Sequence, residues 1–137
     1  MQKANLIQYL KGKKMEPIRI LVVDNEEDQR RLISIILKKF GYFVKTVSSA
    51  EAALTDLASS SYQLIITDLI MPEMEGTELC ERIKHIRPDA RVYALSGHVD
   101  LYDDNKLAQF GFDGTIEKPI DMSRLKETIE SAVGKPD

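Results

Sequence analysis

From residue 18 onward, short apolar runs of strand length alternate with longer stretches in which apolar residues recur at helical spacing. Connections between parallel strands are right-handed and place helices on both faces of a sheet, so this alternation favours one parallel sheet covered on each side. The strands are expected at residues 18–23, 43–47, 63–67, 91–95 and 113–117. We therefore predict an α/β fold, a doubly wound five-stranded parallel sheet with five helices.

Apolar spacing and stop signals locate the helices between these strands. The first helix is expected to stop at Gly41 and the last before Gly134, because glycine commonly terminates helices. The apolar face of the first comprises Leu32, Ile33, Ile36, Leu37 and Phe40, and that of the last comprises Met122, Leu125, Ile129 and Val133. The other helices are expected at residues 49–58, 75–86 and, with a looser pattern, 100–110.

Composition limits the size and the partners of this fold. With 137 residues, 43% of them hydrophobic, the chain can bury one core of ordinary size, so we expect one domain. A net charge of −3 gives no field that would draw the protein onto nucleic acid or an anionic membrane. No apolar run reaches the ~20 residues of a membrane span. The single cysteine, Cys80, excludes an internal disulfide and is expected to be buried on a helical apolar stripe, so we predict a cytoplasmic protein.

Residues 1–17 differ from the rest of the chain. They contain four lysines and one glutamate, so this segment carries +3, and Met15 could serve as an alternative start. We interpret the segment as a basic N-terminal extension or tag, partly helical or disordered; a basic arm that binds a partner is the alternative. The predicted domain then spans residues 18–134, and a tail at residues 135–137 leaves no room for an effector domain.

Polar residues follow four of the predicted strands. The first strand ends into Asp24 and Asn25, the third into Asp68, the fourth into Ser96 and the fifth into Lys118. Ligands of open parallel sheets bind outside the carboxyl ends of the strands, where the strand order reverses. If the order is 2-1-3-4-5, Asp24 and Asp68 lie side by side and repel unless a cation or proton intervenes. Oxygen ligands of this kind suit Mg²⁺, and Lys118 with Ser96 would suit a phosphate.

Each of these residues also has a purely structural interpretation. Asn25 could cap the helix that follows, with Glu26, Glu27 and Asp28 favoured by the helix dipole. Asp68 and Ser96 could be turn residues, and Lys118 could be a solvated lysine beside a proline. Taken singly, the structural interpretations are preferred, but they do not explain why all these positions follow strands and converge.

Four stretches resemble the motifs of one known family, the response-regulator receiver domain. They are "ILVVDNE", "LIITDLIMPEMEG", "ALSGH" and "IEKPI", and the resemblance covers residues 18–133. It implies a flavodoxin-like sheet of order 2-1-3-4-5 and transfer of a phosphoryl group from a sensor histidine kinase or a histidine phosphotransfer protein. It also implies a downstream protein target, a monomer or weak dimer, and no enzyme in the usual sense, since such a domain catalyses only its own phosphoryl transfer and dephosphorylation.

The resemblance assigns a role to each residue at the strand ends. Asp68 matches the phosphoacceptor, Ser96 the switch hydroxyl, and Lys118 the lysine that binds the phosphoryl oxygen. The expected Mg²⁺ ligands are Asp24, Asn25, Asp68 and the backbone carbonyl of Ile70. The family resemblance further predicts a cis peptide bond between Lys118 and Pro119.

Two positions depart from the family pattern. Asn25 replaces the usual second acid of the pair, so the pocket loses a formal charge and Mg²⁺ binding should be weaker. Thr115 replaces the usual tyrosine or phenylalanine three residues before Lys118, and Phe112 could fill part of the missing volume.

Ile70 and His98 border the pocket in the family. We expect them to obstruct the hydrolytic water and to slow the decay of phospho-Asp68. The alternative is that His98 is a solvated loop residue and that Ile70 only covers a hydrophobic neighbour.

Three other functions are alternatives to this one. A pseudo-receiver, a constitutive interaction domain that is never phosphorylated, is suggested by Asn25 and Thr115. A phosphohydrolase of the haloacid-dehalogenase type would need a second aspartate two residues after the first, where Ile70 stands. A flavodoxin-like FMN binder would need a first loop rich in Ser, Thr and Gly, whereas acids stand there.

Overall fold

The computed structural model of the chain describes residue 3, residues 17–97 and residues 102–136. Within these residues it contains five strands and five helices in strict alternation, which confirms the predicted fold class. The strands are β1 (Arg19–Val23), β2 (Phe43–Val47), β3 (Leu64–Asp68), β4 (Arg91–Ser96) and β5 (Gly114–Glu117). The helices are α2 (Glu27–Lys39), α3 (Ala50–Leu57), α4 (Gly76–Ile86), α5 (Asp104–Phe110) and α6 (Met122–Val133).

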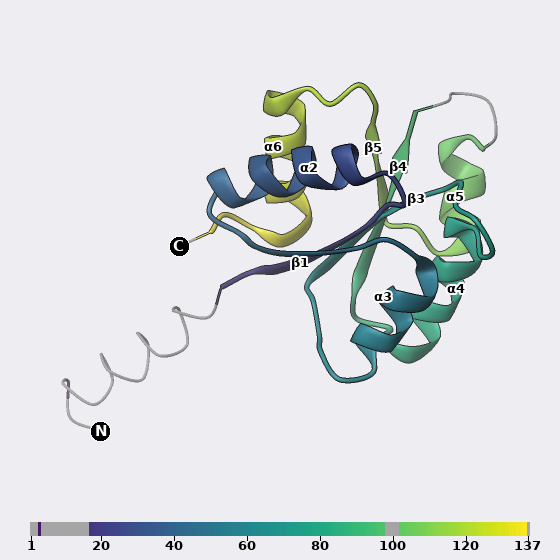
Figure 1. The fold of residues 1–137 in the computed structure, drawn as a ribbon. Helices are drawn as coiled ribbons and strands as arrows, with labels where there is room; N and C mark the ends of the chain where they lie inside the picture. Colours follow the sequence, from purple (N-terminus) through teal and green to yellow (C-terminus); the bar gives the residue numbers. More distant parts are fainter. Residues whose placement is uncertain (1–2, 4–16, 98–101, 137) are drawn as a thin grey trace.

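The sheet has the expected order, β2-β1-β3-β4-β5, and every neighbouring pair of strands is parallel. The order reverses between β1 and β3, so the carboxyl ends of these two strands lie side by side. Figure 1 shows α2 and α6 on one face of the sheet and α3, α4 and α5 on the other. Because helices cover both faces, the central strands are buried on both sides, and the consecutive apolar residues Ile20, Leu21, Val22 and Val23 of β1 are all fully buried.

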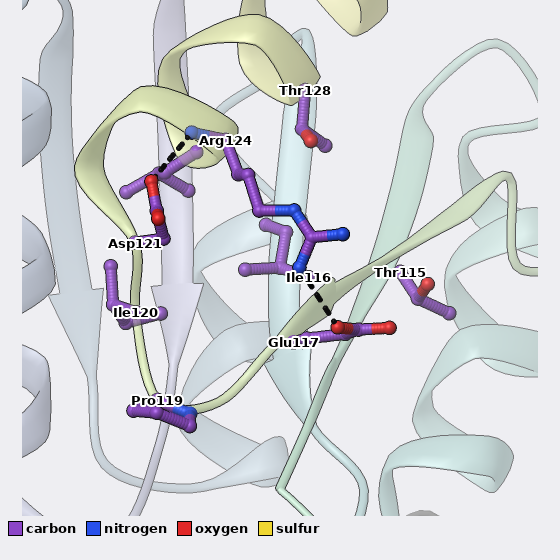
Figure 2. Close-up of a pocket in the computed structure, with 9 residues that line it drawn as sticks. Thr115, Ile116, Glu117, Pro119, Ile120, Asp121, Arg124 and Thr128 are labelled. Atoms are coloured by element: carbon purple, nitrogen blue, oxygen red, sulfur yellow. Dashed lines mark hydrogen bonds and ion pairs between the residues drawn. The ribbon is translucent and has the colours of Figure 1, made fainter.

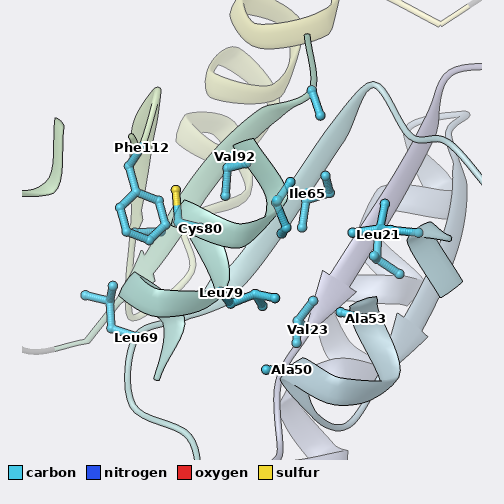
Figure 3. Close-up of a cluster of buried hydrophobic side chains, with 14 of the residues drawn as sticks. Leu21, Val23, Ala50, Ala53, Ile65, Leu69, Leu79, Cys80, Val92 and Phe112 are labelled. Atoms are coloured by element: carbon cyan, nitrogen blue, oxygen red, sulfur yellow. The ribbon is translucent and has the colours of Figure 1, made fainter. Parts of the chain in front are cut away.

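A separate hydrophobic core lies on each face of the sheet. One packs α2 and α6 against residues such as Ile20, Val22 and Leu64. The other packs α3, α4 and α5 against Leu21 and Ile65 (Figure 3). Both cores therefore depend on side chains of the same strands, which point alternately to the two faces.

Cys80 belongs to the core on the α4 face, as expected from its place on an apolar stripe. Its side chain is fully buried, and burial raises the pKa of its thiol to about 12. The thiol therefore stays protonated and behaves as a small apolar side chain.

The predicted helix faces are correct at their centres and wrong at two margins. Ile33, Ile36 and Leu37 of α2 are buried, but Leu32 is 50% exposed because it lies at the edge of that face. In α6, Met122 is 51% exposed, because this first residue of the helix precedes the turns that reach the sheet.

Helix ends also differ from the expected positions. The helix expected at residues 100–110 is α5, which starts at Asp104 because the Asp103 carboxylate accepts a hydrogen bond from the backbone N–H of Lys106, 2.8 Å away. Gly41, at φ 102°, follows the end of α2 as predicted. Residues 100–101, the tail residue 137 and the N-terminal segment apart from residues 3 and 17 lie outside the described residues, and none of the described helices is long and apolar enough to cross a membrane.

Candidate functional site

Asp68 is the last residue of β3, and the local backbone fixes its carboxylate. Its Oδ1 accepts a hydrogen bond from the backbone N–H of Leu69 at 2.9 Å, and its own carbonyl accepts one from the buried Thr67 hydroxyl, also at 2.9 Å. One carboxylate oxygen is thus fixed by a hydrogen bond. The side chain is still 13% exposed, and it lines a pocket.

The loop after Asp68 needs a glycine at its far end. The backbone N–H of Gly76, the first residue of α4, donates to the Leu69 carbonyl at 2.9 Å and closes the loop. A Cβ atom on Gly76 would lie 2.1 Å from the Asp68 carbonyl oxygen, which no side chain could do without moving the backbone. The glycine of the "DLIMPEMEG" stretch therefore lets α4 approach the strand end that carries Asp68.

Lys118 follows β5 and points back to Asp68 across the edge of the sheet. Its ammonium Nζ lies 3.4 Å from Asp68 Oδ2 and 2.8 Å from the side-chain oxygen Oε1 of Gln29 in α2. Its backbone N–H donates to the Ser96 carbonyl at 2.9 Å, so the ends of β4 and β5 are joined beside the site. The Lys118–Pro119 peptide bond is cis, as predicted.

Asp24 is the buried acid of the site. It is fully buried at the end of β1; its Oδ1 accepts a hydrogen bond from the backbone N–H of Glu26 at 2.9 Å, whereas its Oδ2 has no hydrogen-bond partner among the described residues. Burial raises the pKa of this carboxyl, and the negative charge of nearby Asp68 raises it further. A buried carboxylate oxygen without a partner, beside a second carboxylate, is the arrangement that a divalent cation would relieve.

Asn25 does not have the structural role considered for it. The N-cap of α2 is Glu26, whose side chain makes no capping hydrogen bond, and the Glu26 backbone N–H itself donates to the carboxylate of Asp24. Glu27 and Asp28 do lie in the first turn of the helix, where the dipole favours acids. Asn25 itself is exposed, and its part in metal binding stays a prediction.

The pocket next to Asp68 brings most of the predicted residues together. Asp68, Ile70, Ser96 and Lys118 all line it, along with Glu26, Leu69, Leu95 and Gly97. The Ile70 side chain is 54% exposed at the pocket. His98, the other residue expected to shield the site, lies outside the described residues.

The oxygen ligands at this site suit Mg²⁺, although only two of them are carboxylates. Asp24 and Asp68 supply two carboxylates, and the described residues contain no group of three or more His, Cys, Asp and Glu side chains that could hold a metal ion. By the family resemblance, Asn25 stands where a third acid is usual. Mg²⁺ commonly keeps several waters and takes only one or two protein carboxylates. Asp24 and Asp68, with the Ile70 carbonyl, would therefore be enough ligands to hold it.

Thr115, the residue in place of the expected aromatic, leaves open space beside the site. It is half-buried on β5 and lines a pocket that also reaches Ser96, Lys118 and the ring of Tyr102. Phe112 is buried next to Cys80 (Figure 3) and borders a neighbouring pocket together with Thr115. Phe112 thus lies near Thr115, its filling of the missing volume stays a prediction, and Tyr102 is an aromatic neighbour that the sequence did not indicate.

A different hollow lies between β5 and α6 (Figure 2). An exposed ion pair, Arg124 Nη1 to Glu117 Oε2 at 3.4 Å, spans it, and its other lining residues include Ile120 and Thr128. None of the residues predicted to bind metal or phosphate lines this hollow, so the candidate site is the pocket at Asp68.

Gln29 is the site residue that sequence reasoning missed. It stands in the first turn of α2, directly after the acidic cluster, and no motif distinguishes it from a solvated helix residue. The only available signal was its place on a helix that begins at the same sheet edge as Asp24 and Asp68.

Comparison with known proteins agrees with this geometry. The sequence profile described as "Response regulator receiver domain" matches residues 20–130. The response regulator receiver protein CpdR of Brucella abortus is 35% identical over 114 residues, which cover 82% of this chain and 93% of CpdR. The DNA-binding transcriptional regulator NtrC of Azospirillum brasilense is 34% identical over 119 residues, which cover 87% of this chain but 25% of NtrC. The chain thus spans only a small part of the longer curated relatives, down to 12% of the sensor histidine kinase RcsC of Salmonella typhi.

Solved structures show the same architecture. A response regulator receiver domain protein from Clostridium thermocellum superimposes with a TM-score of 0.78 at 31% identity, covering 84% of this chain and 93% of that one. The chemotaxis protein CheY4 of Vibrio cholerae has a TM-score of 0.80 at 22% identity, covering 86% of this chain and 100% of that one, and supports the fold alone. From its sequence, its sheet order and the residues gathered at Asp68, this chain belongs to the response regulator receiver domain family, the phosphorylation-regulated signalling modules of two-component systems.

Proposed function

We propose that the protein accepts a phosphoryl group on Asp68 from a sensor histidine kinase or a histidine phosphotransfer protein, and thereby changes the surface that it offers to a downstream protein. The observation that carries this proposal is the contact of the Lys118 ammonium with Asp68 Oδ2, 3.4 Å away in a pocket beside the buried Asp24. The nucleophile and the cation that would bind the incoming phosphoryl oxygens thus already face each other.

The transfer requires alignment and charge stabilisation more than covalent chemistry from the protein. A carboxylate oxygen of Asp68 attacks phosphorus, the bond from phosphorus to the donor's imidazole nitrogen breaks, and the imidazole leaves. Lys118 attracts one phosphoryl oxygen, and the Ser96 hydroxyl, which also lines the pocket, can donate to another. Mg²⁺, held by Asp24, Asp68 and the Ile70 carbonyl and weakly by Asn25, would neutralise charge on the phosphoryl group.

The competing function is a pseudo-receiver that binds partners without being phosphorylated. It is favoured by the exposed amide of Asn25 in place of an acid and by Thr115 in place of the aromatic. Both functions use the same fold, and they differ in whether Asp68 reacts.

The decisive experiment is intact-mass measurement after incubation with acetyl phosphate and Mg²⁺. We expect the wild type to gain one phosphoryl group and Asp68→Asn to gain none. Asp113→Asn is the matched control, because Asp113 also pairs with a lysine, Lys84 at 2.6 Å, away from the pocket, and it should react like the wild type. An unmodified wild type would favour the pseudo-receiver, and a phosphorylated Asp68→Asn protein would place the acceptor elsewhere.

The lifetime of the phosphorylated form should depend on Ile70. Its half-exposed apolar side chain lines the pocket and cannot hydrogen-bond and orient a hydrolytic water. We expect slow decay of phospho-Asp68 in the wild type and faster Mg²⁺-dependent decay when Ile70→Asn is combined with His98→Ala. Equal decay rates would remove the shielding role.

The other predicted properties concern the whole protein. A cytoplasmic location, a monomer or weak dimer, and no binding of nucleic acid or membranes stay predictions. Sedimentation measured with and without acetyl phosphate would test the oligomeric state.

A further inference from the structure

We infer that Gln29 is a positioning residue that holds the Lys118 ammonium in place for phosphoryl transfer to Asp68. This inference rests on the proposed function, because it assigns a role within that reaction. The hydrogen bond between Lys118 and Gln29 joins the end of β5 to the first turn of α2, and the two residues are 89 positions apart in the chain.

The two contacts of Lys118 are unequal. Its Nζ lies 2.8 Å from Gln29 Oε1, an ordinary hydrogen-bond length, and 3.4 Å from Asp68 Oδ2, beyond the usual 2.7–3.2 Å range for nitrogen and oxygen. The close hydrogen bond of the lysine therefore goes to the neutral amide, and the carboxylate attracts the ammonium from a longer distance. The Lys118 side chain is 19% exposed, so the tether lies in a partly water-excluded site.

The chemistry of the amide suits this task. A lysine ammonium has three N–H donors and no acceptor, so one donor can go to Gln29 while others remain for Asp68 and an incoming phosphoryl oxygen. An amide oxygen accepts this hydrogen bond without cancelling the positive charge, whereas a carboxylate at the same position would form an ion pair with Lys118. The long lysine side chain is flexible, and fixing it beforehand reduces the ordering required when the phosphoryl group arrives.

The position of Gln29 also limits how closely Lys118 approaches Asp68. Without the amide, the ammonium could move from 3.4 Å to full ion-pair contact with the carboxylate that must act as nucleophile. Loss of Gln29 should therefore slow transfer in two ways, by freeing Lys118 and by letting it occupy Asp68.

The test compares two identical substitutions at opposite ends of the sheet. Gln29→Met removes the acceptor for Lys118. Gln63→Met removes a matched amide acceptor that takes the backbone N–H of Arg19 at 2.8 Å, at the end of the sheet where β1 begins. Thermal unfolding of each variant, followed by circular dichroism, reports the purely structural cost of losing one hydrogen bond.

Two readouts then separate positioning from structure. With acetyl phosphate and Mg²⁺, Gln29→Met should be phosphorylated about tenfold more slowly than the wild type, and Gln63→Met within about twofold of it. In ¹⁵N NMR spectra of the side-chain ammonium groups, without any phosphodonor, the Lys118 signal should shift and exchange faster with water in Gln29→Met but not in Gln63→Met.

A third variant keeps the acceptor and changes its charge. Gln29→Glu should retain a protected Lys118 ammonium signal but still transfer slowly, because the ammonium is then paired with a carboxylate. The inference is overturned if Gln29→Met transfers at the wild-type rate, or if its Lys118 signal is unchanged. A wild type that takes up no phosphoryl group would instead refute the proposed function, and the ammonium signal would still decide whether Gln29 holds Lys118.

Discussion

Asp24 carries a buried carboxylate oxygen that finds no hydrogen-bond partner within the described part of the chain, and this residue should lower the stability of the metal-free protein. We predict that Asp24→Asn raises the free energy of unfolding in EDTA by about 1–2 kcal/mol, because it removes a buried charge that Asp68 opposes. Added Mg²⁺ should stabilise the wild type and leave the variant unchanged. Urea unfolding with EDTA or Mg²⁺ measures both effects, and a variant less stable than the wild type in EDTA would contradict the first.

Asn25 should limit the affinity for Mg²⁺. Asn25→Asp restores a carboxylate at the second position of the pair, so we predict about tenfold tighter Mg²⁺ binding and lower stability without metal, since a third carboxylate adds repulsion. Isothermal titration of the wild type, Asn25→Asp and the exposed control Asn105→Asp would test this. Equal affinities of the first two proteins would mean that Asn25 does not reach the metal.

At the scale of elements, the contact between α4 and the end of β3 depends on Gly76. A methyl group there would lie 2.1 Å from the Asp68 carbonyl oxygen, so Gly76→Ala must move the helix or the strand end. We predict a loss of about 2–3 kcal/mol of unfolding free energy and slower phosphorylation of Asp68.

Gly134→Ala provides the comparison for that variant, because apart from its chain neighbours no atom of the described residues lies within 4 Å of its added Cβ, although φ there is +85°. It should cost about 1–3 kcal/mol, from backbone strain alone, because φ +85° with ψ 174° is a conformation that almost only glycine adopts, and it should leave phosphorylation unchanged. Equal effects of the two substitutions on phosphorylation would argue against a special role for the contact at Gly76.

The link between α3 and the loop before β3 should be sensitive to high pH. The Tyr62 hydroxyl donates a hydrogen bond to Asp56 Oδ2 at 2.5 Å. Burial of the hydroxyl, and to a lesser extent this hydrogen bond, raises the pKa of Tyr62 from 10.0 to about 12. The folded protein thus holds this proton more tightly than the unfolded chain, so the stabilisation is complete below pH 10 and is lost as the pH rises toward 12.

Tyr62→Phe should therefore cost about 1 kcal/mol at neutral pH, and the difference from the wild type should shrink between pH 10 and 12. Unfolding by urea at each pH gives the comparison. A difference that stays constant over that interval would show that the proton is not held by the fold.

The positions of helices and strands were predicted well where the spacing of apolar residues is clear. β2 was predicted with its observed bounds, and the other strands within one residue at each end; for β1, β3 and β4 the signal was a short run of apolar residues that the structure buries. Leu32 and Met122 were misplaced because helical spacing gives a face but not its width or the point where a helix leaves the sheet. The Asn25 cap was wrong because the helix begins one residue later than apolar spacing suggests, so that the N-cap position falls on Glu26.

At the scale of the whole molecule, the site could be predicted where it follows from topology. Asp68, Ser96 and Lys118 end neighbouring strands, and the carboxyl ends of parallel strands meet at one edge whatever the side chains elsewhere. Gln29 could not be predicted, because its contact with Lys118 depends on how α2 is rotated over the sheet, which apolar spacing does not fix to the accuracy of a hydrogen bond.

The two cores share the sheet, and this should make unfolding cooperative. Ile83 in the core of α4 and Ile129 in the core of α6 are both fully buried, on opposite faces. We predict that Ile83→Ala and Ile129→Ala each cost about 2–5 kcal/mol and shift a single unfolding transition. Far- and near-ultraviolet circular dichroism should give the same midpoint for each variant; separate midpoints would mean that one face unfolds before the other.

The all-parallel sheet has a further consequence for how the protein acquires its activity. Every ladder joins strands separated by at least one helix, and the contact from Lys118 to Asp68 spans 50 residues. Such long-range pairing makes folding slow, because the entropy of closing long loops is lost before the contacts form. During synthesis, β5 and Lys118 are made after the other four strands, and α6 follows them. A growing chain therefore has its nucleophile Asp68 before it has the lysine beside it, and it becomes able to receive a signal only after Lys118 has been added and β5 has joined the sheet.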